Sequence, residues 1–324
     1  MATATNLDVT LPNPVVLRRQ SKLPAWLRAL FKNPVSIAGI VLISLFALVA
    51  IFAPVIVSTV EPTVAQQVDP DNPFATPRDG YASQPQPPNA EHIFGTTEGQ
   101  FDIFYGVVWG TRTAFMVGIL ITGSTLIVGI AVGLISAYYG GLVDESMQRI
   151  VEIFLAFPFL MAAITMSAVL GPKVHNGILT GMIALAVFGW PSYARYVRGD
   201  VLAVKERDYV LAARAVGVRD LRMLIRHILP NAMYSVLVVA SLDIGTYVLS
   251  FAALSFLGVG AELGYADWGQ MLSLARNWIP NLADYWWILV YPGMALVLYV
   301  LAWNLVGDAF RDALDPKMRG LRAG

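Results

Sequence analysis

Apolar residues gather along the chain into six long stretches that carry almost no charge, and polar residues lie between them. Because the apolar core of a bilayer is about 30 Å thick, a helix needs roughly 20 apolar residues to cross it. Helix is also the conformation in which a single segment satisfies its own backbone polar groups in lipid. The pattern therefore predicts an all-α integral membrane protein with six transmembrane helices. The six stretches are Val35–Val57, Thr113–Val143, Ile153–Pro172, Asn176–Ala194, Ala232–Val259 and Tyr285–Gly307.

Lysine and arginine are distributed unevenly among the polar segments. The N-terminal tail holds five, residues 195–226 hold eight, and the segment after the sixth stretch holds four. The opposite side keeps only Arg78, Arg112, Lys173 and Arg276. Since basic residues are enriched in cytoplasmic loops, both termini are expected to be cytoplasmic. An even number of membrane crossings requires the same side for both ends.

The stretches and loops divide the chain into five expected parts. Residues 1–33 form a cytoplasmic tail, 34–58 a first transmembrane helix, and 59–110 a proline-rich, acidic extracytoplasmic segment. Residues 111–309 form a five-helix core that includes a cytoplasmic loop over 199–230, and 310–324 form a second tail. Within the first tail, Ser21–Asn33 places Trp26 and Phe31 on one helical face and its basic residues towards the other. This pattern favours a helix along the membrane surface, with an ordinary basic flank as the alternative.

The amino-acid composition excludes several kinds of functional site. Hydrophobic residues make up 56% of the chain and charged residues 14%, the balance of a chain surrounded mostly by lipid. The net charge is zero, so no global field favours nucleic acid. Cysteine is absent, which excludes disulfides, thiolate metal sites and cysteine nucleophiles. The three histidines form no convincing ligand pair, so no metal site is expected.

The basic cytoplasmic loop is too patterned for a simple connection. Asp208–Val216 is rich in alanine and is followed by Gly217, which suits a left-handed helix cap. A second helix is expected over Asp220–Leu229, with Pro230 in the first turn of the fifth span. The small residues leave one surface low enough to enter a groove of another protein. The residues alone leave two interpretations open, a docking element and a solvated amphipathic loop.

A family resemblance bears on that choice. The run Tyr209–Gly217 and the run Arg226–Asn231 resemble the coupling motif of ATP-binding-cassette (ABC) importer permeases, in which Glu-Ala-Ala, three residues, Gly, nine residues and Ile-x-Leu-Pro follow in order. Ala212, Ala213, Gly217, Leu229 and Pro230 match in register. Leu211 replaces the glutamate, and His227 stands at the isoleucine position. The resemblance implies an ATPase-coupling loop made of Asp208, Leu211, Ala212, Ala213, Arg214, Ala215, Gly217, His227, Leu229 and Pro230.

An ordered series of further runs extends the resemblance from about Ala90 to Arg319. The runs are similar to the C-type permease of dipeptide, oligopeptide and nickel importers. Before the second span, however, residues 95–102 lack the arginine that the family usually has there. The matching runs are Leu155–Pro158, Trp190–Arg195, Leu254–Gly258, Trp268–Gly269, Asn304–Asp308 and Arg311–Pro316.

The resemblance implies a type I ABC importer permease fold and a set of partners. A second, homologous permease subunit would complete a heterodimer, two cytoplasmic ATPase subunits would grip the coupling loops, and an extracytoplasmic binding protein would deliver the substrate. No Gly-x-x-x-x-Gly-Lys-Ser/Thr phosphate loop occurs in the chain, so ATP and Mg²⁺ are expected on the partner subunits and no cofactor on this chain. The chain is not expected to be an enzyme. It is expected as a multi-pass protein of a bacterial-type cytoplasmic (inner) membrane.

Peptides are the cargo that the resemblance favours, as di- or oligopeptides. Nickel chelates, glutathione-like compounds and oligosaccharides are the alternatives within the same class. An ion-coupled secondary transporter is the alternative from another class, but it would not need a docking loop.

Two further features have two interpretations each. Asp243 lies about 20 Å along a helix from Pro230, at 1.5 Å per residue, and therefore near the middle of the membrane. It is a candidate pathway or gate residue, or a structural partner of the second permease. The acidic segment between Glu61 and Asp102 is either a docking face for the binding protein or a solvated loop.

Overall fold

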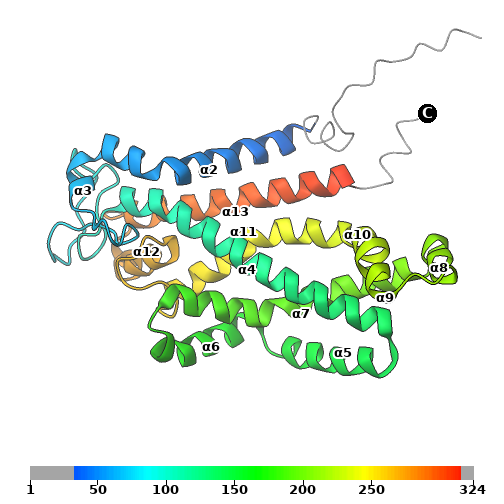
Figure 1. Ribbon diagram of the computed structural model, residues 1–324. Helices are drawn as coiled ribbons and strands as arrows, with labels where there is room; N and C mark the ends of the chain where they lie inside the picture. The colour runs from blue at the N-terminus through cyan, green and yellow to red at the C-terminus, as the bar shows by residue number, and fades with distance from the viewer. Residues whose placement is uncertain (1–32, 315–324) are drawn as a thin grey trace, which may run out of the picture.

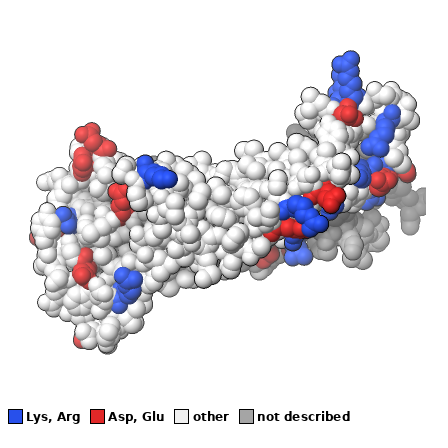
Figure 2. Space-filling model, turned by 90° about the horizontal axis from the view of Figure 1, so that it is seen from below, with Lys and Arg blue, Asp and Glu red and all other residues white. Residues whose placement is uncertain are grey.

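The computed structural model describes residues 33–314, with side chains described to residue 312, and every regular element in this range is helical. Long helices run side by side along one direction, and irregular backbone collects at the two ends of the bundle (Figure 1). One end holds α3 and α12 and is called the α3 end here. The other holds α8 and α9 and is called the α8 end. Figure 2 shows Lys, Arg, Asp and Glu towards these two ends, with an uncharged band between them.

Five single helices are long and apolar enough to cross a membrane: α2 (Pro34–Val60), α4 (Ile103–Tyr139), α7 (Gly177–Lys205), α11 (Tyr234–Phe256) and α13 (Trp287–Leu314). A sixth candidate is the pair α5 (Gly141–Leu155) and α6 (Phe159–Val174), bent by 83° at the break between them. The shorter elements are α3 (Pro62–Gln66), α8 (Asp208–Ala215), α9 (Asp220–Arg222), the π-helix η1 (Met223–Ile228), α10 (Leu229–Ala232), α12 (Trp268–Ala275) and the 3₁₀-helix η2 (Arg276–Asn281).

The predicted third span was wrong as a single helix. The stretch Ile153–Pro172 begins inside α5 and crosses the break at residues 156–158. Pro158 is the N-cap of α6, with an extended ψ of 120°. Proline disfavours the helical conformation in the residue before it and donates no backbone hydrogen bond, so α5 ends before Pro158 and α6 leaves in a new direction.

Other boundaries moved outward. The second span begins at Ile103 rather than Thr113, because the Asp102 side chain caps the helix by accepting the Tyr105 N–H at 2.6 Å. The fourth runs on to Lys205, well past Ala194. The expected surface helix over Ser21–Asn33 and the expected tails lie outside the described residues, except Asn33, which caps α2, and the end of α13.

Close contact between α4 and α7 forms the centre of the bundle. A Cβ atom built on Gly129 would lie 2.3 Å from the Cβ of Tyr193, and one built on Gly133 would lie 2.5 Å from the Ala194 carbonyl oxygen. Only glycine lets the two backbones approach this closely. Val117, Ile121, Tyr193, Val197 and Phe251 belong to the buried cluster around this contact.

The proline-rich segment between α3 and α4 is folded onto the bundle. Its backbone bonds to the α11–α13 connection, with Thr76 N–H on Gly264 O at 2.7 Å and Ala266 N–H on Phe74 O at 2.8 Å. Phe94 stacks on Tyr291 with ring centroids 3.9 Å apart. The segment is irregular, as its prolines predict, but it has a defined structure.

A cluster of ionisable groups, in which His92 and Asp102 are buried and Asp79 is exposed, holds this segment at the ends of α2 and α4. His92 Nδ1 lies 2.7 Å from Asp102 Oδ2, and His92 Nε2 lies 2.9 Å from Asp79 Oδ2. Because each ring nitrogen faces a carboxylate, both carry a proton and the imidazole is positively charged. Glu61, at the end of α2, accepts the Ile93 N–H at 2.6 Å.

The cluster shifts the pKa of its members. Hydrogen bonding to Asp102, and then to Asp79, raises the pKa of His92 to about 9. Burial and the neighbouring Asp102 raise the pKa of Glu61 to about 8, so this carboxyl is protonated at neutral pH. Glu61 and Asp102 are therefore buried structural groups, which removes two of the seven carboxylates from the predicted docking face.

We expect the packing of residues 61–102 to weaken as pH rises. The stabilisation from charged His92 is complete below its ordinary pKa of 6.5 and is lost as pH rises through about 9. The stabilisation from neutral Glu61 falls in the same way, as pH rises from the ordinary glutamate pKa of 4.5 through about 8. Hydrogen exchange of the segment, measured between pH 6 and pH 10 and corrected for the intrinsic rate, should show the loss. In His92→Ala the segment should be about 2 kcal/mol less stable already at pH 6. Equal protection across this range in the unsubstituted protein would contradict the expectation.

Candidate functional site

The expected coupling loop projects from the α8 end of the bundle (Figure 1). Asp208 is the first residue of α8, and the helix ends where the glycine predicts. Gly217 has φ +78°, its N–H donates to Arg214 O at 3.0 Å, and the Val218 N–H donates to Ala213 O at 3.2 Å. These two bonds form a Schellman cap. The predicted helix stop is confirmed.

One face of α8 anchors the loop and the other is open. Val210 is fully buried and Ala213 is half-buried against the rest of the chain. The open face carries Leu211, Ala212, Arg214, Ala215 and Gly217, and beside them Val216 is 81% exposed. Most of these side chains are small or apolar, so the surface is low and only weakly hydrated. Exposed apolar surface of this kind is common where proteins contact one another.

The second half of the loop differs from the prediction. The helix expected over Asp220–Leu229 is α9 followed by the π-helix η1, and Pro230 lies in the first turn of α10 rather than of the fifth span, which begins at Tyr234. A proline ring clashes with the carbonyl four residues earlier in an α-helix, and the wider π turn relieves that clash. His227 and Leu229 are half-buried here and Pro230 is exposed.

The loop is tied to the end of α4. The Tyr138 hydroxyl donates to Asp220 Oδ1 at 2.5 Å, and the Arg214 guanidinium lies over the Tyr138 ring at 6.0 Å. The Lys205 ammonium donates to the Ala137 carbonyl at 3.1 Å. Movement of the loop would therefore act on α4 as well as on α7.

An ion pair that the sequence analysis missed lies beside these contacts. Arg198 on α7 donates from Nε to Asp144 Oδ1 at 2.7 Å and from Nη2 to Asp144 Oδ2 at 2.6 Å. The Ser136 hydroxyl on α4 also donates to Asp144. The carboxylate at the start of α5 thus joins three helices. The partners are 54 residues apart in sequence, and no local spacing signals such a pair. Arg149 and Glu152, three residues apart on α5, form a second ion pair at 3.3 Å, but both side chains are exposed.

Asp243 lies inside the bundle, between α11 and α7. Its Oδ2 accepts a hydrogen bond from the Tyr193 hydroxyl at 2.7 Å, and Tyr193 is almost completely buried while Asp243 is half-buried. Asp243 is the tenth residue of α11, so it is well inside the span, as predicted. Among the described residues, Tyr193 is the one hydrogen-bond partner of this half-buried carboxylate.

Within residues 33–312, no three His, Asp or Glu side chains are arranged to hold a metal ion. The carboxylates near His92 instead pair with that imidazole.

Two family models match the chain. Residues 129–320 match the binding-protein-dependent transport system inner membrane component, and residues 25–88 match the N-terminal transmembrane domain of oligopeptide transport permease C. The first match covers the predicted coupling loop, Asp144, Arg198 and Asp243.

Full-length relatives agree with these matches. The chain is 39% identical over 292 residues to the dipeptide transport system permease protein DppC of Alkalihalophilus pseudofirmus, covering 90% of this chain and 89% of that protein. It is 36% identical over 303 residues to the oligopeptide transport system permease protein OppC of Bacillus subtilis, covering 93% and 92%.

Among solved structures, the MetNI methionine ABC transporter in an inward-facing conformation has a chain that superimposes with a TM-score of 0.52 at 22% identity. The match covers 68% of this chain and 97% of that chain, and it supports the fold alone. The apolar helices and the two family models identify a multi-pass membrane protein. The chain belongs to the family of binding-protein-dependent transport system inner membrane components.

Proposed function

We propose that this chain is the permease subunit of an ATP-driven importer that carries di- or oligopeptides across a bacterial-type cytoplasmic membrane. A second, homologous permease subunit completes the channel, two ATPase subunits supply the energy, and an extracytoplasmic binding protein delivers the peptide. The α8 end and both termini face the cytoplasm in this proposal. The observation that carries it is the open face of α8, capped at Gly217, in a chain whose permease family match includes that loop. Peptide cargo is supported by the names of the DppC and OppC relatives.

The loop contacts suggest how ATPase motion enters the membrane. An ATPase subunit that grips the open face of α8 moves the adjoining end of α7. Because the Arg198–Asp144 pair joins α7 to α5, the start of α5 moves with it. The break between α5 and α6 has an angle of 83° and lacks continuous helical bonding, so it can absorb the change while α6 keeps its place beside α7.

Gly217→Asp should abolish both co-purification with the ATPase subunits and peptide uptake. Aspartate adds a charge to the contact surface and is strained by about 1 kcal/mol at φ +78°. The measurement is affinity capture of the complex followed by uptake in proteoliposomes. Gly80→Asp is a matched control, because Gly80 has φ +86° in open space at the α3 end. Capture of the ATPase at the unsubstituted level by Gly217→Asp would contradict the proposal.

Asp144→Asn should uncouple ATP hydrolysis from uptake. The change removes the charge that Arg198 binds, at a cost of about 2 kcal/mol to the link between α5 and α7, while the open face of α8 stays intact. We expect ATPase binding to be retained and the peptide imported per ATP hydrolysed to fall about tenfold. The charge exchange Asp144→Arg with Arg198→Asp should restore part of the ratio. An unchanged ratio in Asp144→Asn would remove this pair from the coupling path.

Asp243→Asn should reduce uptake and leave assembly intact. Asparagine still accepts the Tyr193 hydrogen bond, so the change isolates the charge of Asp243. The complementary variant Tyr193→Phe keeps the charge and removes the hydrogen bond. A pathway role predicts that Asp243→Asn lowers initial uptake rates more than Tyr193→Phe at equal expression. Full uptake by Asp243→Asn would exclude the pathway role.

A further inference from the structure

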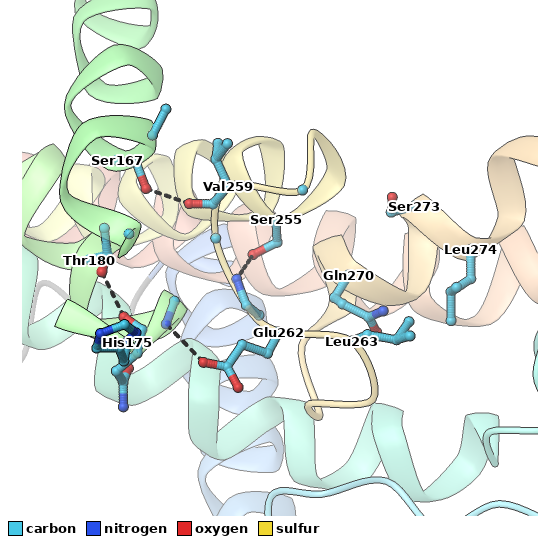
Figure 3. Close-up of a pocket in the computed structure, with 17 residues that line it drawn as sticks. Ser167, His175, Thr180, Ser255, Val259, Glu262, Leu263, Gln270, Ser273 and Leu274 are labelled. Carbon is cyan, nitrogen blue, oxygen red and sulfur yellow. Dashed lines mark hydrogen bonds between the residues drawn. The ribbon is translucent and has the colours of Figure 1, made fainter. Parts of the chain in front are cut away.

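A cavity of about 760 Å³ opens at the α3 end of the bundle, between the ends of α6, α7 and α11 and the start of α12 (Figure 3). The volume is in the range of sites that bind small ligands. Its wall includes the polar residues Ser167, Asn176, Thr180, Ser255, Glu262 and Gln270. The cavity is separate from the α8 loop and from the Arg198–Asp144 pair.

Three hydroxyl groups of the wall are bonded within the protein. Ser167 donates to the Val259 carbonyl, Thr180 donates to the Asn176 carbonyl at 2.7 Å, and Ser255 accepts the Ala261 N–H at 2.9 Å (Figure 3). These bonds hold residues 259–261 and the start of α7 in place. They shape the cavity.

Gln270 is the exception among the buried groups. Its side chain lies on α12 and lines the cavity, and the residue is only 5% exposed. Its backbone N–H is bonded to Asp267, but its carboxamide has no hydrogen bond to any described residue. Because the carboxamide faces the cavity, its acceptor and its two donors are accessible to a ligand. The carboxamide, with one acceptor and two donors, matches a peptide group.

Glu262 provides the charge of the cavity. It is exposed at the wall, and one of its oxygens accepts the Gly177 N–H at 3.2 Å, which leaves the other oxygen available. The wall also includes the exposed imidazole of His175, and its described residues contain no second carboxylate and no lysine or arginine. The carboxylate of Glu262 is therefore the group that favours a cationic ligand, and polar hydrogen-bonding groups lie around it.

We propose that this cavity binds the amino-terminal end of a peptide, with the α-ammonium at Glu262 and the first peptide group at Gln270. This inference rests on the proposed function, since it identifies the cargo as a peptide with a free amino terminus. The permease then takes part in selecting the cargo at its outer end, before the peptide enters the membrane.

The test uses the complete transporter, with its partner subunits but without the binding protein, so that selection by that protein does not contribute. A photoreactive tripeptide is crosslinked to the complex, and unlabelled trialanine, N-acetyl-trialanine and trialanine amide compete. We expect trialanine and its amide to compete equally. N-acetyl-trialanine should require a concentration about five-fold higher to reduce crosslinking by half. Equal competition by all three peptides would overturn the proposal.

Three variants locate the effect. Glu262→Gln should abolish the preference for a free amino terminus, and Glu262→Asp should keep it. Gln270→Leu should weaken the binding of all three peptides to the same extent. With the binding protein restored, Glu262→Gln should raise the apparent KM for trialanine uptake about five-fold at unchanged kcat. A preference that survives in Glu262→Gln would overturn the assignment, and because Glu262 is exposed this variant does not depend on core packing.

Two outcomes distinguish this inference from a docking role of the cavity and from a failure of the proposed function. If Glu262→Gln weakened the affinity of the ligand-free binding protein for the transporter by the same factor, the cavity would be a docking site for that protein and the proposal would fail. If the unsubstituted transporter imported no peptide with ATP, the proposed function itself would fail. Import with no amino-terminal preference would leave the proposed function standing and remove only this inference.

Discussion

The structure depends on one constraint, the need of every backbone polar group in an apolar layer to find a partner in its own segment. Within residues 33–314, five helices satisfy it in single pieces, and the helix of the α5–α6 pair is interrupted only at residues 156–158. Irregular backbone is therefore displaced to the two ends of the bundle, where water or neighbouring loops complete its hydrogen bonds. The segments that can bind other molecules lie at these ends for the same reason.

Close packing then connects the two ends. Gly129 and Gly133 let α4 lie directly against α7, and α7 runs without interruption from the cavity at Gly177 to Lys205 beside the α8 loop. The Arg198–Asp144 pair adds α5 to this unit. One helix, α7, therefore links the α8 loop at one end of the bundle to the cavity at the other.

Both ionic hydrogen bonds and apolar contacts hold the α3 end together. His92 joins Asp79 and Asp102, and neutral Glu61 sits beside them, so a segment with little regular structure is held against α2 and α4. The same segment meets the α11–α13 connection, which also forms one wall of the cavity. The buried charges thus fix the frame in which Glu262 and Gln270 face the cavity.

The local sequence pattern was enough to predict the helical fold class, five of the spans and the end of α8 before Gly217. Apolar length and a left-handed glycine are properties of neighbouring residues, and they act in the same way in any context. The family motif likewise located the exposed face of α8. The break at Pro158 has a local cause as well, but the continuous apolar pattern on both sides concealed it.

Tertiary structure decided the rest, because these features join residues that are distant in sequence. The Asp144–Arg198 pair, the burial of Glu61 and Asp102, and the Tyr193–Asp243 bond exist only once helices pack. The acidic composition of residues 61–102 indicated a charged surface, yet folding turned part of that charge inward, where His92 compensates it. Gln270 shows the same limit, since only the packed structure reveals that its carboxamide faces a cavity.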